Sequence, residues 1–178
     1  MISYNVFLDR ERLPAAADWA RLIREAGFEV QLSTEFEPHS HSGYLPCPDE
    51  RTGFEYYLEA FGAPAFEIGE IGESGAKAIG QRNAVASLRF SGRPADRTAA
   101  IAAAATLTAM TDGVLFDTEP GHFIGAHQAL AWARNERYQP VATYRRRAMR
   151  RKARLTPAVI VRLLIIVFLA LAVWFLRK

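Results

Sequence analysis

The feature that most constrains this chain is a basic block that runs directly into a long apolar segment. Between Pro157 and Leu176 only one residue, Arg162, is charged. These 20 residues, at about 1.5 Å of helix rise each, would extend roughly 30 Å, the thickness of the hydrocarbon core of a bilayer. Arg162 lies near the basic block, so its long side chain can reach the headgroups. The sequence therefore predicts a transmembrane helix over residues 157–176, in preference to a buried core helix.

The basic block predicts a juxtamembrane linker over residues 141–156 and an orientation for the chain. Basic residues beside a spanning segment stay on the cytoplasmic side, and they attract anionic lipid. Residues 1–13 lack the basic and apolar regions of a signal peptide. We therefore expect a tail-anchored, single-pass protein of the bacterial inner membrane, with residues 1–140 as a cytoplasmic N-terminal head. The expected membrane-surface residues are Arg145, Arg146, Arg147, Arg150, Arg151, Lys152 and Arg154.

The head and the tail carry charges of opposite sign. Residues 1–140 contain 12 Arg or Lys and 19 Asp or Glu, a net charge of −7, whereas residues 141–178 contain 10 basic residues and no acidic one. An acidic head repels phosphates, so we expect no nucleic-acid partner. Cys47 is the single cysteine, which excludes an intrachain disulfide.

Hydrophobic periodicity predicts two β-α-β units in the head. Residues 2–8 alternate as a strand does, Pro14 opens a helix that ends near Gly27, and residues 28–33 alternate again. The second unit repeats this order and adds a last helix. Its elements are expected at residues 84–90 (strand), 94–111 (an alanine-rich helix), 114–116 (strand) and 126–137 (helix).

The middle of the head gives weaker signals. Residues 34–51 are typical of a polar, proline-containing loop, and residues 54–61 fit either period but favour a strand because glycines bound them. Four glycines between Gly69 and Gly80 predict a loop there. The expected fold is α+β: a compact antiparallel sheet with helices mainly on one face, for which a ferredoxin-like arrangement of β-α-β repeats would fit.

Motifs for chemistry are weak in this chain. His39, His41, Cys47 and Asp49 have the residue types of a zinc site, but they lack the spacing of an established motif, which favours an ordinary loop. The glycine-rich run from Gly69 to Gly75 contains two glutamates that would repel a phosphate. There is no Gly-x-Ser-x-Gly elbow. We therefore predict no catalytic, cofactor-binding or metal-binding residues.

One segment, residues 35–75, is both acidic and aromatic. It holds nine acidic residues and seven aromatic residues against the single base Arg51. Aromatic side chains supply contact area in protein interfaces, and acidic ones steer a basic partner. The alternative is that the aromatics fill the core and the acids form a solvated face. The predicted partner-binding residues are Glu55, Tyr56, Tyr57, Glu59, Glu70 and Glu73.

Three stretches of the head resemble small bacterial immunity-type proteins, which accompany secreted antibacterial toxins. The stretches are YNVFLDRERLPAAADW, GYLPCPDERTGFEYY and TDGVLFDTEPG. The resemblance implies a non-enzymatic protector that binds one cognate toxin, and it carries over no site residue. We therefore expect the head to bind a protein partner, most specifically a basic toxin domain. The alternatives are a membrane-tethered metal-dependent enzyme and a structural adaptor of a membrane assembly.

Overall fold

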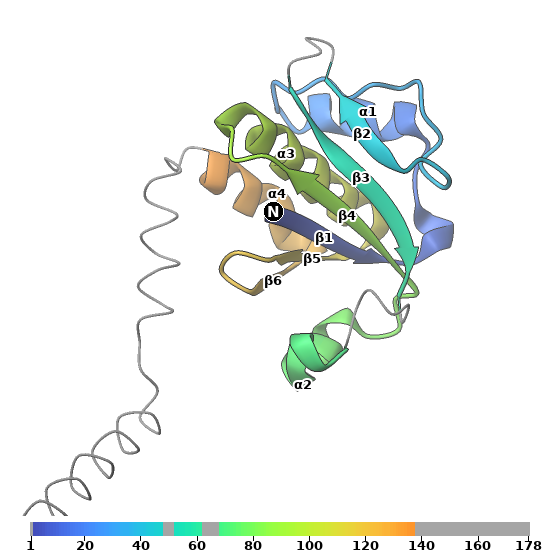
Figure 1. Ribbon diagram of the computed structural model, residues 1–178, viewed down its shortest axis with the longest axis vertical. Helices are drawn as coiled ribbons and strands as arrows, with labels where there is room; N and C mark the ends of the chain where they lie inside the picture. Colours follow the sequence, from blue (N-terminus) through green and yellow to red (C-terminus); the bar gives the residue numbers. More distant parts are fainter. Residues whose placement is uncertain (1, 48–51, 62–67, 138–178) are drawn as a thin grey trace, which may run out of the picture. The chain divides into compact units, whose positions relative to one another are not determined.

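A computed structural model describes residues 2–47, 52–61 and 68–137 of the chain (Figure 1). They form a six-stranded sheet in the order β2-β3-β4-β1-β5-β6, with every neighbouring pair antiparallel. The class is α+β with an antiparallel sheet, as the sequence predicts. The strands are β1 (Ile2–Leu8), β2 (Gly43–Pro46), β3 (Gly53–Ala60), β4 (Ala84–Phe90), β5 (Val114–Asp117) and β6 (His122–Gly125), and the helices are α1 (Ala16–Glu25), α2 (Ile68–Ile79), α3 (Pro94–Thr111) and α4 (Ala126–Arg137).

The segments predicted to meet the membrane, residues 141–156 and 157–176, lie outside the described residues. Within residues 2–47, 52–61 and 68–137, no helix has both the length and the apolar character needed to cross a bilayer.

The centre of the sheet is the pair β1 and β4. The two strands pair along their whole lengths, beginning with Ile2 opposite Phe90. Because side chains alternate between the two faces of a strand, Tyr4, Val6 and Leu8 all point into the main hydrophobic core. Both strands were predicted from this alternation, and both predictions are confirmed.

The topology contains two interlocked β-α-β units. β4 and β5 are both antiparallel to β1 and flank it, so they run parallel to each other, and α3 connects them. In the same way β1 and β3 flank β4, and α1 lies on the connection between them. The unit that contains β1 and β3 therefore has β4 between its two strands, and the unit that contains β4 and β5 has β1 between its two strands.

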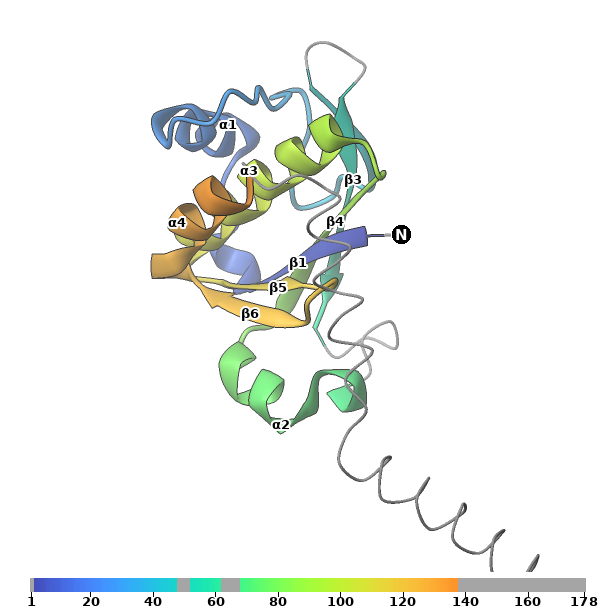
Figure 2. The same ribbon diagram turned by 90° about the vertical axis from the view of Figure 1, so that its left-hand side faces the viewer.

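Helices α1, α3 and α4 lie together on one face of the sheet (Figures 1 and 2). The small alanines of α3 from Ala99 to Ala105 are buried, which lets this helix approach the sheet closely. Trp19 of α1 ties the two helices together, because its indole N–H donates to the Ala103 carbonyl oxygen and to Thr106 Oγ1, each at 3.1 Å. Pro94 stands at the first turn of α3, as predicted.

Residues 28–33 are not a strand, so the predicted closing strand of the first β-α-β unit is wrong. Phe28, Val30 and Leu32 are nevertheless buried and belong to the main core. The alternation therefore identifies the side chains that face the core, but it does not show that the backbone pairs with another strand. The strand that closes this unit is β3, which confirms the strand interpretation of residues 54–61.

Two further elements differ from the sequence prediction. The glycine-rich segment predicted as a loop is helix α2, which bends at Gly72, where the backbone adopts φ 69° and ψ 173°. Strand β6 was not predicted; it pairs with β5 and places Phe123 opposite Phe116. Both differences arise because tertiary packing overrides weak local preference: α2 buries Ile79, and β6 extends the sheet.

Candidate partner-binding face

Alternation along β3 divides the predicted partner-binding residues between the two faces of the sheet. Tyr56 points toward the helices and is 0% exposed. Its hydroxyl donates to the Pro38 carbonyl oxygen at 3.0 Å, its ring lies 5.8 Å from that of Trp19, and burial raises its pKa. Tyr56 is therefore a core residue, and its prediction as a surface contact is wrong.

Glu55, Tyr57 and Glu59 point to the opposite face, which we call the open face because α1, α3 and α4 all lie on the other side (Figure 2). The Tyr57 hydroxyl donates to Glu55 Oε2 at 3.3 Å. The guanidinium of Arg89, from the adjacent strand β4, lies 4.7 Å from the centroid of the Tyr57 ring. The open face therefore presents an aromatic ring flanked by two carboxylates and covered in part by one cation.

The edge of the open face is formed by β2. Tyr44 is directly opposite Glu55 in the sheet, so the two side chains share this face. Tyr44 is 48% exposed, which is unusual for a large aromatic side chain. Accessible aromatic side chains of this kind are enriched in protein interfaces.

One end of the open face is covered by α2. Ile79 of this helix packs with Phe7 and Val85 in a second, smaller hydrophobic cluster. Glu73 lies exposed on α2, and Glu70 belongs to the same helix. The predicted residues other than Tyr56 therefore belong to two elements, β3 and α2.

Two polar residues lie at the middle of the open face. Asn5 of β1 and Ser87 of β4 are directly opposite each other in the sheet, and they are 6% and 4% exposed. Their neighbours across the sheet in the same row are Tyr57 and Phe116.

The residues of the predicted metal alternative are not gathered at one point. His39 is exposed, whereas His41 packs 5.3 Å from the ring of Phe36, and Cys47 is buried. His41 Nε2 is buried and has no hydrogen-bond partner within the described part of the chain. Asp49 lies outside the described residues. Within the ranges that the structure describes, no group of three or more potential metal ligands is present.

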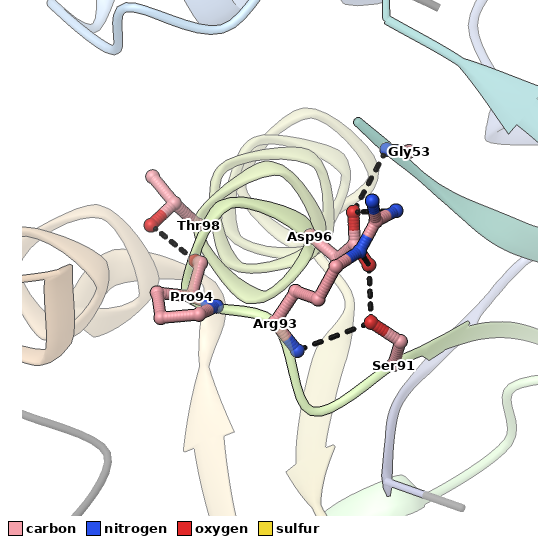
Figure 3. A network of polar contacts seen from close by, with 6 residues as sticks. All are labelled: Gly53, Ser91, Arg93, Pro94, Asp96 and Thr98. Atoms are coloured by element: carbon pink, nitrogen blue, oxygen red, sulfur yellow. Dashed lines mark hydrogen bonds and ion pairs between the residues drawn. The ribbon is translucent and has the colours of Figure 1, made fainter. Parts of the chain in front are cut away.

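A buried carboxylate holds the start of β3 against the turn before α3 (Figure 3). Asp96 is 2% exposed and accepts hydrogen bonds from Ser91 Oγ, from Arg93 Nε at 2.8 Å and from the Gly53 N–H at 3.3 Å. Burial by itself would raise the pKa of Asp96, but the hydrogen bonds from Ser91, Arg93 and Gly53 hold it below its usual value. This network is structural, because every bond joins elements of the fold.

Gly53 is required at this junction. A Cβ on Gly53 would lie 2.4 Å from the Leu45 carbonyl oxygen and 2.6 Å from the ring of Tyr44. The network and the glycine together fix the edge hairpin of β2 and β3, and with it the position of Tyr44 on the open face.

A second buried ion pair lies on the helix side of the sheet. Arg97 of α3 donates to Glu136 of α4 at 3.3 Å, and the two side chains are 8% and 15% exposed. Arg97 Nε also donates to the Tyr4 hydroxyl at 3.3 Å. These contacts join α3, α4 and β1, so they stabilise the packing of helices on the sheet and leave the open face unaffected.

The predicted membrane-surface residues, Arg145 to Arg154, lie outside the described residues. Comparisons with protein-family models, with curated proteins and with solved structures found no match to the chain.

Proposed function

We propose that this protein is a membrane-tethered binding module, and that the open face of its sheet binds a basic protein partner. The most specific form of the proposal is immunity: the head binds and neutralises a cognate antibacterial toxin at the bacterial inner membrane. The open face is then the interface, with Glu55, Tyr57, Glu59 and Tyr44 as its principal residues.

One observation carries this proposal. The sheet has three helices on one face, whereas the other face displays Tyr57 between Glu55 and Glu59, with the exposed ring of Tyr44 beside them. Aromatic side chains are enriched in protein interfaces, and carboxylates around them accelerate association with a basic surface.

The proposed fold is a ferredoxin-like core with additions at both edges. β5, β1, β4 and β3 would be its four strands, and α1 and α3 its two helices. β2 and β6 extend the sheet at either edge, and α2 is inserted between β3 and β4. Such a core has helices on one face only, which leaves the second face available for a partner.

The experiment is a pair of matched charge reversals in the full chain. Glu55→Lys with Glu59→Lys changes the open face, and Asp18→Lys with Glu25→Lys makes the same charge change on exposed positions of α1. The partner to assay is the product of the neighbouring gene. We expect the first variant to lower the association rate by about tenfold at low salt, because steering depends on these charges.

The control on α1 should keep the association rate of the wild type within about twofold, since rim charges far from a contact have little effect. Equal losses in both variants would show that only net charge matters, and they would contradict the open face as the interface. Protection of cells against the neighbouring gene product, measured by growth, should follow the same order as binding.

The membrane tether is tested separately. About 20 apolar residues can satisfy their backbone polar groups as a helix within lipid, so the full chain should remain with membranes after carbonate extraction. A reporter active only in the cytoplasm should function when fused to Met1, because the basic linker precedes the predicted helix. Release of the full chain by carbonate, or the reverse reporter pattern, would contradict the tether or its orientation.

A further inference from the structure

The Tyr57 ring on the open face already has a cation over it, and the chain itself supplies that cation. The guanidinium carbon of Arg89 lies 4.7 Å from the centroid of the ring. Arg89 is opposite Glu55 in the sheet, and Tyr57 lies two residues farther along β3 on the same face. Arg89 is exposed and Tyr57 is partly buried, so the contact lies at the surface of the head.

The Arg89 guanidinium is held only weakly in this position. In the described part of the chain it forms neither a hydrogen bond nor an ion pair, although Glu55 is directly opposite. Arg93, by contrast, donates two hydrogen bonds to the Asp96 carboxylate, at 2.8 and 2.9 Å. A cation over an aromatic ring at an exposed position is a weak interaction, so a second cation can displace Arg89 at little cost.

The two carboxylates beside the Tyr57 ring also lack a basic partner. Within the ranges that the structure describes, neither Glu55 nor Glu59 takes part in an ion pair. The Tyr57 hydroxyl donates to Glu55 Oε2 at 3.3 Å, which ties the ring to one of the two charges. The open face therefore offers a cation both the face of an aromatic ring and an adjacent negative charge, and Arg89 uses only the ring.

We propose that Arg89 is an internal competitor for the partner protein: it occupies the Tyr57 ring until an arginine side chain of the partner displaces it. This inference rests on the function proposed above. The partner's guanidinium then lies over the Tyr57 ring and donates to the Glu55 carboxylate, and Glu59 adds negative charge beside the site. Arg89 moves into solvent, so it lowers the affinity for the partner without contacting the partner.

An arginine of the partner fits this site better than a lysine or an acidic side chain. A guanidinium is planar and weakly hydrated, so it can lie over a ring and donate to a carboxylate at the same time, whereas the lysine ammonium is a compact, strongly hydrated charge. The position of Arg89 shows that the Tyr57 ring accepts a guanidinium. A carboxylate of the partner could instead bind Arg89, but Glu55 and Glu59 would repel it.

The test measures how removal of Arg89 changes the binding of an arginine probe. The probe is the blocked peptide acetyl-Gly-Arg-Gly-amide, and its neutral citrulline analogue is the control peptide. Binding to the full chain in mild detergent is followed by NMR at the carbon-labelled ring of Tyr57. The arginine peptide should bind at millimolar concentration. Arg89→Gln should tighten this binding by about twofold to fivefold, which corresponds to the strength of an exposed contact between a cation and a ring.

Two further variants separate competition for the ring from a change in net charge. Arg24→Gln makes the same charge change at an exposed position of α1, on the other side of the sheet, and should leave binding of the peptide unchanged. Tyr57→Leu should weaken the binding, here followed at the backbone amide of residue 57. In that background Arg89→Gln should give no gain, because no ring remains to compete for.

Unchanged or weaker binding of the arginine peptide to Arg89→Gln would overturn the inference, and so would equal gains in Arg89→Gln and Arg24→Gln or equal binding of the citrulline peptide. The proposed function fails in a different way. If the open-face charge reversal abolishes partner binding while Arg89→Gln does not tighten binding of the peptide, the interface stands and only this inference is lost. If Arg89→Gln tightens binding of the peptide but the charge reversal has no effect on the partner, the cation site stands and the proposed interface fails.

Discussion

Tyr56 and Tyr57 are neighbours in one strand, yet they belong to two regions of the molecule that have different roles. Tyr56 faces the helices, is fully buried and donates its hydroxyl to a backbone carbonyl. Tyr57 faces the opposite side, where its ring meets the charged groups of Arg89 and Glu55. The ring of Tyr56 therefore contributes to the core, whereas the ring of Tyr57 lies beside charged groups on the open face. Because side chains alternate along a strand, these two consecutive residues lie on opposite faces of the sheet.

The largest expected difference between the two faces is in stability. Tyr56→Ala should lower the free energy of unfolding by about 3–5 kcal/mol, because it removes a fully buried ring. Tyr57→Ala should lower it by less than about 1 kcal/mol, as expected for a substitution outside the core. Thermal unfolding of the full chain in mild detergent, followed by near-ultraviolet circular dichroism, measures both. Equal losses would mean that the open face is as tightly packed as the covered one.

Tyr56→Phe serves as the control for the covered face. It keeps the ring and removes only the hydroxyl, whose bond to the Pro38 carbonyl oxygen is 3.0 Å long. The expected loss is about 1 kcal/mol, the usual net contribution of one hydrogen bond.

The sequence predicts an element correctly where its local pattern of residues matches the surface that the element buries in the fold. The strand at residues 2–8 and the helix that begins at Pro94 are of this kind, because alternation or alanine content matches the surface that each element buries. The segment at residues 28–33 alternates as clearly, but its side chains enter the core from an extended connection. Periodicity therefore identifies the buried side chains more reliably than it identifies their hydrogen-bond partners.

The candidate site was predicted only in part, for a related reason. Composition identified residues 35–75 as acidic and aromatic, but composition cannot assign Tyr56 and Tyr57 to different faces without the register of β3. Tyr57 and Arg89 lie 32 positions apart in the sequence, and only the pairing of β3 with β4 brings them together. Sites assembled across a sheet leave no local motif.

The buried charge at Asp96 should show the next largest effect. Asp96→Asn keeps the shape of the side chain but weakens its charge-assisted hydrogen bonds, and should cost about 1.5–3 kcal/mol at pH 7. Because the pKa of Asp96 is lowered in the folded state, its contribution is present above the unfolded pKa. It is lost as the pH falls below about 4 toward the folded pKa.

Denaturation of the wild type and of Asp96→Asn across that pH range checks this expectation, since their difference should shrink as the pH falls. Asp112→Asn is the matched control, because Asp112 has a side chain that is 76% exposed and a left-handed backbone that asparagine tolerates. A difference that stays constant with pH would mean that the charge of Asp96 does not contribute to stability.

A smaller and more local effect is expected at Gly72, where α2 bends at one end of the open face. Its φ of 69° and ψ of 173° lie in a region that only glycine adopts readily, so Gly72→Ala should cost about 1–3 kcal/mol within α2. Hydrogen exchange should therefore increase at the amides of residues 73–79 and remain unchanged in α3. Gly92→Ala, at a position with open space and no positive φ, should have no such effect. Faster exchange throughout the core would show that α2 is integral to the covered face as well.

The smallest expected effect is at the two glutamates of the open face, and it is the most direct test of the difference between the faces. Glu55→Gln with Glu59→Gln removes two negative charges but keeps the size of the side chains and a hydrogen-bond acceptor for the Tyr57 hydroxyl. Partly exposed charges contribute little to folding, so the free energy of unfolding should change by less than about 0.5 kcal/mol. Removing these charges should even be slightly favourable in a head with a net charge of −7, because like charges repel. Denaturant unfolding of the full chain at low and high salt measures the change, and a loss above about 1 kcal/mol would mean that the two carboxylates belong to the folded framework. A stable variant that associates more slowly with its partner would separate binding from folding on this face, which no substitution of Tyr56 can do.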